Sequence, residues 1–164
     1  MDVTSEIKDK VLGSVRQTNV PFDVLSIDPN LSDTAEFCAK YEVPLENTAN
    51  TILAVAKKNP KTYCACVVLA TTRLDVNRKV KELMASKSSF ASAEEMTSLT
   101  GMQVGAVTPF GLPEGIPIYV DTKVIEREWV VLGAGERASK LKVSPQAILK
   151  LSNSTVVEDL ANLK

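Results

Sequence analysis

Thr100-Gly101-Met102-Gln103-Val104-Gly105-Ala106-Val107-Thr108-Pro109-Phe110-Gly111-Leu112-Pro113 is the stretch from which the rest of the sequence is best interpreted. Its glycines permit positive φ and close approach of the backbone to a ligand, whereas its prolines fix φ. With backbone N–H groups at 105–107, it could be a loop shaped to hold a ligand with main-chain atoms. Composition alone favours an ordinary connection between two elements, because such connections are commonly rich in Gly and Pro.

Length and composition predict an ordinary globular protein. The chain has 164 residues, which predicts one domain over residues 1–164, and 45% apolar with 24% charged residues is typical of such domains. The net charge of −1 argues against strong non-specific nucleic-acid binding, although clustered basic residues could still contact RNA. No apolar run approaches the roughly 20 residues that span a bilayer. The acidic, polar start over residues 1–6 is unlike a secretory signal, so we expect a cytoplasmic protein without a membrane partner.

The sequence contains no histidine. This excludes Ser-His and Cys-His nucleophile pairs and removes the commonest zinc ligand. Cys64 and Cys66 are two apart in a β-like run and therefore share one face, which does not match a CxxC motif. We expect these two and Cys38 to be buried free thiols, and we expect no metal site and no cofactor.

Hydrophobic periodicity predicts an α+β fold with a mixed, largely antiparallel central sheet flanked by about five helices. Helices are expected over 4–18, 32–41, 75–84, 92–100 and 145–149. Strands are expected over 22–27, 51–56, 63–70, 116–121, 129–132 and 141–143. The runs 51–56 and 63–70 should form a central hairpin whose tip carries Lys57, Lys58 and Lys61. Residues 124–128 suggest a polar link, and the tail over 155–160 is ambiguous.

Short motifs for nucleotide binding and nucleophilic catalysis are weak. Gly133-Ala134-Gly135 lacks the full GxGxxG pattern, because position 138 is alanine and no N-terminal βαβ unit precedes it. No GxxxxGK[ST] run is present, and Ser98 and Ser139 have no histidine to activate them.

Taken together, the loops resemble those of the YbaK/ProX family, the free-standing relatives of the editing insertion domain of bacterial prolyl-tRNA synthetase. The order and spacing agree over roughly residues 10 to 150. The segments that carry the resemblance are Ala49-Asn50-Thr51-Ile52-Leu53, Asp75 with Arg78-Lys79-Val80, Thr100-Gly101, Gly105-Ala106-Val107-Thr108-Pro109-Phe110-Gly111, Val120-Asp121 and Gly133-Ala134-Gly135.

The resemblance implies hydrolysis of misacylated tRNA in trans. Gly105 and Pro109 fall on the family's GxxxP loop, which holds the aminoacylated 3′ end. Backbone donors there can bind a carbonyl oxygen as negative charge develops on it. The attacking water would be positioned by backbone and by the terminal ribose hydroxyl, so no histidine is needed. The implied catalytic residues are Asn50, Gly105 and Ala106, and the implied substrate-binding residues are Gly101, Gly105, Ala106, Val107, Thr108, Pro109, Gly133 and Gly135.

The chain departs from the family in two places. The family's lysine, which contacts the tRNA end, falls on Asn50, and asparagine supplies no charge. The stretch after Gly135 also lacks the histidine by which some members select the amino acid. Lys140 or Arg137 could supply the missing positive charge from another strand.

Three functions follow from this pattern. The first is an aminoacyl-tRNA deacylase acting on a tRNA that carries a small wrong amino acid, with tRNA-Pro as a candidate. The second is a catalytically weak module of the same fold that binds tRNA or an aminoacyl-tRNA synthetase. The third is a small-molecule enzyme that uses the same pocket.

Overall fold

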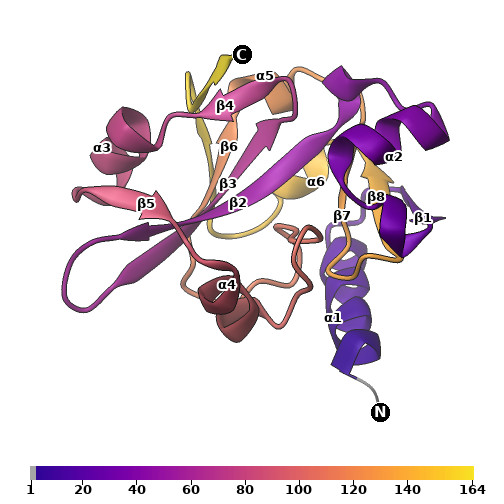
Figure 1. The fold of residues 1–164 in the computed structure, drawn as a ribbon, viewed down its shortest axis with the longest axis horizontal. Coiled ribbons are helices and arrows are strands. Elements are labelled where there is room, and N and C mark those ends of the chain that lie inside the picture. The colour runs from indigo at the N-terminus through magenta and orange to yellow at the C-terminus, as the bar shows by residue number, and fades with distance from the viewer. Residues whose placement is uncertain (1–2) are drawn as a thin grey trace.

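The fold is organised around a five-stranded sheet in the order β5-β2-β3-β6-β9, seen in the computed structural model, which describes residues 3–164, with side chains from residue 6 onward (Figure 1). The β5–β2 and β2–β3 pairs are antiparallel, and the β3–β6 and β6–β9 pairs are parallel. The predicted hairpin is its centre, with Ala49 paired to Leu69 and Ala56 to Thr62. The strands are β5 (Ser88–Phe90), β2 (Ala49–Ala56), β3 (Thr62–Leu69), β6 (Ile118–Asp121) and β9 (Ser154–Val157).

Two smaller sheets complete the β-structure, and all their strand pairs are antiparallel. One has the order β1-β8-β7 and the other pairs β10 with β4. Within residues 3–164 most strand pairs are therefore antiparallel, which confirms the predicted mixed α+β sheet. The strands are β1 (Phe22–Ser26), β8 (Ser139–Val143), β7 (Val130–Gly133), β10 (Ala161–Leu163) and β4 (Thr72–Leu74).

Helices cover both faces of the central sheet. Within residues 3–164 there are six α-helices, and none is long and apolar enough to cross a membrane. Short 3₁₀ turns occur at Pro29–Leu31 and Leu45–Asn47. The α-helices are α1 (Val3–Gln17), α2 (Thr34–Tyr41), α3 (Lys81–Met84), α4 (Ala93–Thr100), α5 (Thr122–Ile125) and α6 (Gln146–Leu149).

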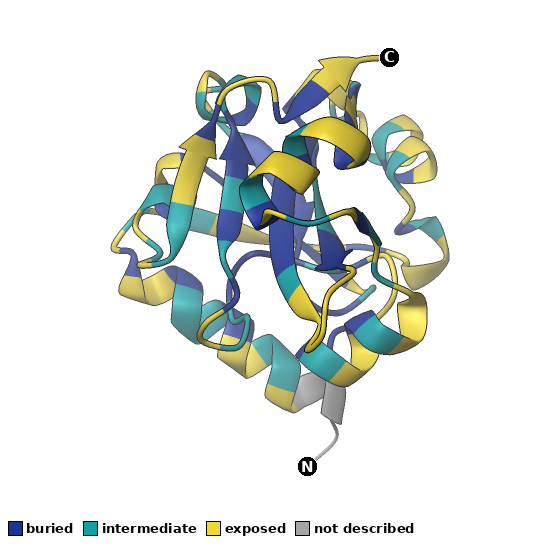
Figure 2. Cartoon of the chain, turned by 90° about the vertical axis from the view of Figure 1, so that its left-hand side faces the viewer, coloured by how far each residue is buried: buried dark blue, intermediate teal, exposed yellow. Residues whose placement is uncertain are grey.

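Alternation along the hairpin strands divides the core into two layers, because successive side chains point to opposite faces. Leu53, Ala65 and Val67 face the larger layer, which includes side chains from α1, α4, α6 and the β1-β8-β7 sheet. Ala54, Cys64 and Cys66 face the smaller layer, beneath α3, β4 and β10. A third cluster packs Phe37 of α2 on the outer face of the β1-β8-β7 sheet. Figure 2 shows the resulting buried strands inside a more exposed shell.

The structure confirms the predictions that rest on a few adjacent residues. Ser92 and Glu95 form a reciprocal capping box at the start of α4, and Gly101 ends that helix with φ +72°. Cys64 and Cys66 are buried free thiols whose sulfurs lie 3.9 Å apart on one face. Cys38 is free but only partly buried.

Three expected elements differ from the structure. The helix expected over 75–84 begins as a π-helical turn over Val76–Val80 before α3. The polar link expected over 124–128 overlaps α5, because the Asp121 side chain accepts from the Lys123 N–H and starts a helix. The ambiguous tail contains β9 and leads into β10, which pair with β6 and β4 respectively.

Asp121 is the polar anchor of this C-terminal segment. Its carboxylate is fully buried and accepts hydrogen bonds from the backbone N–H groups of Lys123 at 3.2 Å and Ala161 at 3.0 Å. The Lys123 ammonium lies 3.8 Å away. The second residue of the Val120-Asp121 motif therefore joins β6, α5 and β10.

We predict that Asp121→Ala lowers the free energy of unfolding by roughly 2–4 kcal/mol, because it leaves two N–H groups without acceptors and removes a helix cap. Urea denaturation measures the change. Asp159→Asn is the control, since its carboxylate also lies 3.8 Å from Lys123 but is 63% exposed, and we expect less than about 0.5 kcal/mol. Equal effects of the two variants would contradict the anchoring role.

Candidate functional site

The glycine-proline loop, the free edge of β2, the start of α2 and the end of β7 enclose a cavity of about 250 Å³. Four predicted site residues line it: Asn50, Gly105, Val107 and Gly133. The other lining residues are Asp33, Thr34, Ala49, Thr51, Ile52 and Lys140. Segments separated by about half of the chain therefore meet at one concave site.

Gly133 allows the loop to approach β7 closely. A Cβ atom added to Gly133 would lie 2.5 Å from the Val107 carbonyl oxygen and 2.7 Å from that of Ala106. The φ of Gly133 is outside the left-handed region, so the glycine is required for space and not for backbone conformation. The loop is further fixed to this strand end where the Gly135 N–H donates to the Ala106 carbonyl at 2.8 Å.

Three predicted residues contribute to the architecture around the cavity. Gly101 ends α4, and a Cβ there would lie 2.8 Å from Ile7 of α1. Gly135 has φ +88° and packs against Ile7 in the same way. Pro109 is buried and lines a separate cavity beside α1.

The backbone donors of the loop are not equivalent. The Ala106 N–H donates to the Gln103 carbonyl at 3.0 Å, and Ala106 is only 2% exposed. Among the described residues, the N–H groups of Gly105 and Val107 have no hydrogen-bond acceptor, and both residues line the cavity. The loop donors without a protein partner are therefore those on either side of Ala106.

Arg137 holds the rim of the loop. Its guanidinium donates to the carbonyls of Val104 at 2.9 Å and Pro29 at 3.3 Å, and it lies 3.5 Å from the Asp33 carboxylate. A Cβ on Gly105 would lie 2.6 Å from this guanidinium. Arg137 thus cross-links the loop to the start of α2, and its charge is shared with Asp33.

Lys140 of β8 is the cation inside the cavity. It is only 5% exposed, and no carboxylate within the described part of the chain forms an ion pair with its ammonium. The nitrogen lies 5.0 Å from the centre of the Phe37 ring, a cation–π contact. Burial lowers the pKa of Lys140, the charge of Arg137 lowers it further, and Cys38 and Asp33 partly oppose these effects.

Polar groups of β2 complete the lining. The Thr34 hydroxyl donates to the Asn50 side-chain oxygen at 3.1 Å, which orients the amide and leaves its NH₂ group as a donor. The buried hydroxyls of Thr51 and Thr108 have no partner among the described residues. Since an unsatisfied buried hydroxyl is costly, Thr51 is a further group that a ligand or water could satisfy.

Sequence patterns identified the loop and Asn50 but not Thr34, Thr51 or Asp33. Thr51 lies beside Asn50 in the family-like segment but was given no role. Thr34 and Asp33 carry no motif, and the packing of α2 beside the edge of β2 brings them to the cavity. Lys140 was one of two cations suggested by sequence, and it is the one that lines the cavity. The described residues contain no cluster of three or more His, Cys, Asp or Glu side chains suited to a metal.

Comparison with known proteins relates most of the chain to translation quality control. The model of the aminoacyl-tRNA editing domain family matches residues 28–151. The Enterococcus faecalis protein named "Putative Cys-tRNA(Pro)/Cys-tRNA(Cys) deacylase EbsC" is 24% identical over 92 residues, covering 56% of this chain and 56% of that protein. A proline–tRNA ligase of Streptococcus pneumoniae is 30% identical over 108 residues, covering 66% of this chain and 17% of the ligase.

The likeness extends to the whole fold. The crystal structure of hypothetical protein APE2540 superposes with a TM-score of 0.83 at 27% identity, covering 93% of this chain and 99% of that one. The match spans about half the length of EbsC and of the Bacillus subtilis protein YwhH, and less than a fifth of the ligase.

We predict that Gly133→Ala destabilises the protein by roughly 1–3 kcal/mol, because the added methyl group would overlap two carbonyl oxygens of the loop. Gly13→Ala is the matched control, since no atom lies within 4 Å of its Cβ position in α1. That helical substitution should stabilise by roughly 0.5–1 kcal/mol. Urea denaturation of both variants checks the pair, and a Gly133→Ala protein as stable as wild type would contradict the close approach.

Proposed function

Because the chain belongs to the aminoacyl-tRNA editing domain family, we propose that it is a trans-acting aminoacyl-tRNA deacylase. In the reaction, the oxygen of a water molecule adds to the ester carbonyl carbon. The bond from that carbon to the ribose oxygen then breaks, and the ribose oxygen takes a proton. The products are a free amino acid and an uncharged tRNA.

The observation that carries this proposal is Lys140, which lines the cavity, is only 5% exposed and has no ion-pair partner for its ammonium among the described residues. Burying a charge without a partner is costly, so such groups are concentrated at sites where a ligand supplies the opposite charge. The 3′ end of an aminoacyl-tRNA brings phosphate groups and, during hydrolysis, a developing oxyanion. Both would be stabilised by this cation.

Lys140 would provide from β8 the charge that the family lysine provides from β2. Asn50 occupies that position on β2, and its oriented amide would donate a hydrogen bond to the substrate. The two residues line the same cavity. In this proposal, the positive charge comes from β8 instead of β2 but acts on the same part of the substrate.

The loop would stabilise the oxyanion. The free N–H groups of Gly105 and Val107 are preorganised by the Gly133 contact and the Arg137 cross-link. Preorganised donors stabilise developing negative charge without a side-chain base. Ala106 would support this arrangement through its turn hydrogen bond to Gln103.

The size of the cavity favours a small amino acid. Its volume of about 250 Å³ is below the roughly 300–1,000 Å³ typical of sites for drug-sized ligands. The apolar parts of Ile52 and Val107 with the hydroxyls of Thr34 and Thr51 would accept a short side chain. The substrate would therefore be a tRNA that carries a small wrong amino acid, with tRNA-Pro the candidate acceptor.

A catalytically weak binding module is the second candidate, and the uncharged Asn50 at the lysine position favours it. Deacylation of a panel of tRNAs that carry small amino acids, including Cys-tRNA(Pro), separates the two. Hydrolysis above the uncatalysed rate supports the enzyme. Binding without turnover at micromolar protein, followed by gain of turnover in Asn50→Lys, supports the binding module.

We predict that Lys140→Met lowers kcat/KM for deacylation by roughly 100-fold, since removing one preorganised electrostatic group costs about 10²–10³ in rate. Lys142→Met is the matched control on the same strand. Its ammonium lies 4.3 Å from the Trp129 ring centre and is not part of the cavity lining. Equal kinetics of the two variants would contradict a role for Lys140.

The same variant tests the buried charge without any substrate. A lysine with a lowered pKa binds fewer protons in the folded than in the unfolded protein, so the free energy of unfolding rises as pH increases through that window. Lys140→Met should therefore be at least as stable as wild type at pH 7, and this difference in stability should shrink as the pH rises toward the ordinary lysine pKa of about 10.4. Urea midpoints at each pH measure this, and a growing advantage would contradict it.

A further inference from the structure

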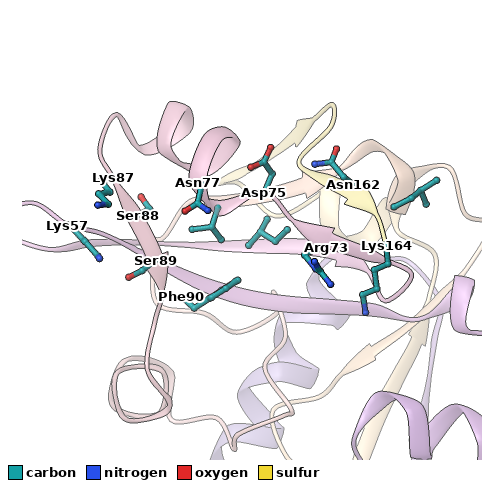
Figure 3. Close-up of a pocket in the computed structure, with 13 residues that line it drawn as sticks. Lys57, Arg73, Asp75, Asn77, Lys87, Ser88, Ser89, Phe90, Asn162 and Lys164 are labelled. Atoms are coloured by element: carbon teal, nitrogen blue, oxygen red, sulfur yellow. The ribbon is translucent and has the colours of Figure 1, made fainter.

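A second concave surface, which we call the basic groove, lies away from the cavity between β5, β4 and the end of β10 (Figure 3). Its volume is about 670 Å³, and Leu74 and Val76 contribute apolar lining. In Figure 3, Lys57 and Lys87 lie at one end of the groove, and Arg73 and Lys164 lie at the other. The proposed deacylation chemistry uses none of these residues.

The basic groove concentrates positive charge. Four cationic side chains line it, against the single carboxylate side chain of Asp75, whereas the chain as a whole has a net charge of −1. Asp75 is itself engaged, because the Arg78 side chain donates to it at 3.2 Å. Among the described residues, no hydrogen bond or ion pair holds the four cationic side chains, and all four are exposed. The surface is therefore suited to a polyanion.

An exposed aromatic ring lies on the same surface. Phe90 ends the edge strand β5, lines the groove and is 58% exposed. Cationic side chains beside an exposed aromatic ring are the combination with which proteins hold single-stranded nucleic acid, since phosphates meet the charges and bases stack on the ring. An acidic peptide would use the charges but would gain little from the ring.

The groove lies within reach of the cavity along one strand. Phe90 pairs with Ala54 of β2, four positions from Asn50, which is roughly 13 Å at about 3.3 Å per residue. This is about four stacked nucleotides at a rise of about 3.4 Å. A single RNA end could therefore pass from the groove to the cavity.

We propose that the basic groove binds the tRNA backbone next to its 3′ end while the aminoacylated terminus occupies the cavity; this rests on the proposed function. Arg73, Lys87 and Lys57 contact phosphates, and Phe90 stacks on an unpaired base. The groove thus supplies affinity for RNA that the weakly acidic protein as a whole does not.

The test measures binding of uncharged tRNA by fluorescence anisotropy at several salt concentrations. The double variant Arg73→Gln/Lys87→Gln should weaken binding roughly tenfold at low salt and reduce the salt slope by about 1.5, because each lost phosphate contact removes about 0.7–0.9. Phe90→Ala should weaken binding about fivefold or more with little change in slope. The matched control Arg16→Gln/Lys40→Gln removes the same charges from exposed positions of α1 and α2 and should bind as wild type does.

Affinity and salt slope equal to those of the control would overturn the proposal. So would a wild-type protein that binds polyglutamate but not tRNA, which would assign the groove to an acidic protein partner. Circular dichroism verifies folding, and Lys57→Gln serves as a second variant if the double variant unfolds. Binding of uncharged tRNA requires no hydrolysis. A wild-type protein that binds tRNA through the groove but hydrolyses no aminoacyl-tRNA would contradict the proposed deacylase activity and would leave the groove proposal standing.

Discussion

The close contact between Gly133 and the loop carbonyls of Ala106 and Val107 is the constraint on which the cavity depends. It places the end of β7 directly against the loop, and the hydrogen bond from the Gly135 N–H to the Ala106 carbonyl fixes these two segments relative to each other. With a side chain at position 133, the loop would have to move away from β7, and the N–H groups of Gly105 and Val107 would move with it. Gly133 thus acts by letting two backbone segments approach closely, and the cavity lies at that approach.

A largely buried cation, Lys140, lies beside this contact in a chain that has no histidine. Burial removes hydration from Lys140, and the Phe37 ring, Cys38 and Asp33 offset only part of this cost, so the pKa of Lys140 is lowered. The same charge is stronger in its effect on a ligand because little water screens it. Arg137, in contrast, is satisfied by Asp33 and two carbonyls, and its contribution is to hold the loop. Of the two neighbouring cations, Arg137 is therefore held by the loop and Asp33, whereas Lys140 has no ion-pair partner among the described residues.

Sequence reasoning succeeded where a few adjacent residues determine the outcome. The Ser92–Glu95 capping box, the Gly101 helix end and the hairpin of two neighbouring apolar runs, β2 and β3, are all local, and each is confirmed. The tail over 155–160 was ambiguous from sequence because its short apolar runs carry no periodicity of their own. The strands β9 and β10 depend on pairing partners that lie some 35 to 90 positions earlier in the chain. The same distinction holds for the candidate site. The glycine-proline loop could be identified from its composition, whereas the Thr34–Asn50 hydrogen bond depends on tertiary packing.

The net charge of the sequence does not show where the charged side chains lie on the folded protein. Nineteen basic and twenty acidic residues nearly cancel over the chain, yet the cations of the basic groove come from the hairpin tip, β4, the start of β5 and the last residue. Many carboxylates lie elsewhere, on the exposed faces of helices such as α2 and α4. Because charges in water are screened within about 10 Å, a polyanion at the groove responds mainly to the nearby cations and little to distant carboxylates. A weakly acidic protein can therefore present an RNA-binding surface, provided that its fold gathers dispersed lysines and arginines at one place.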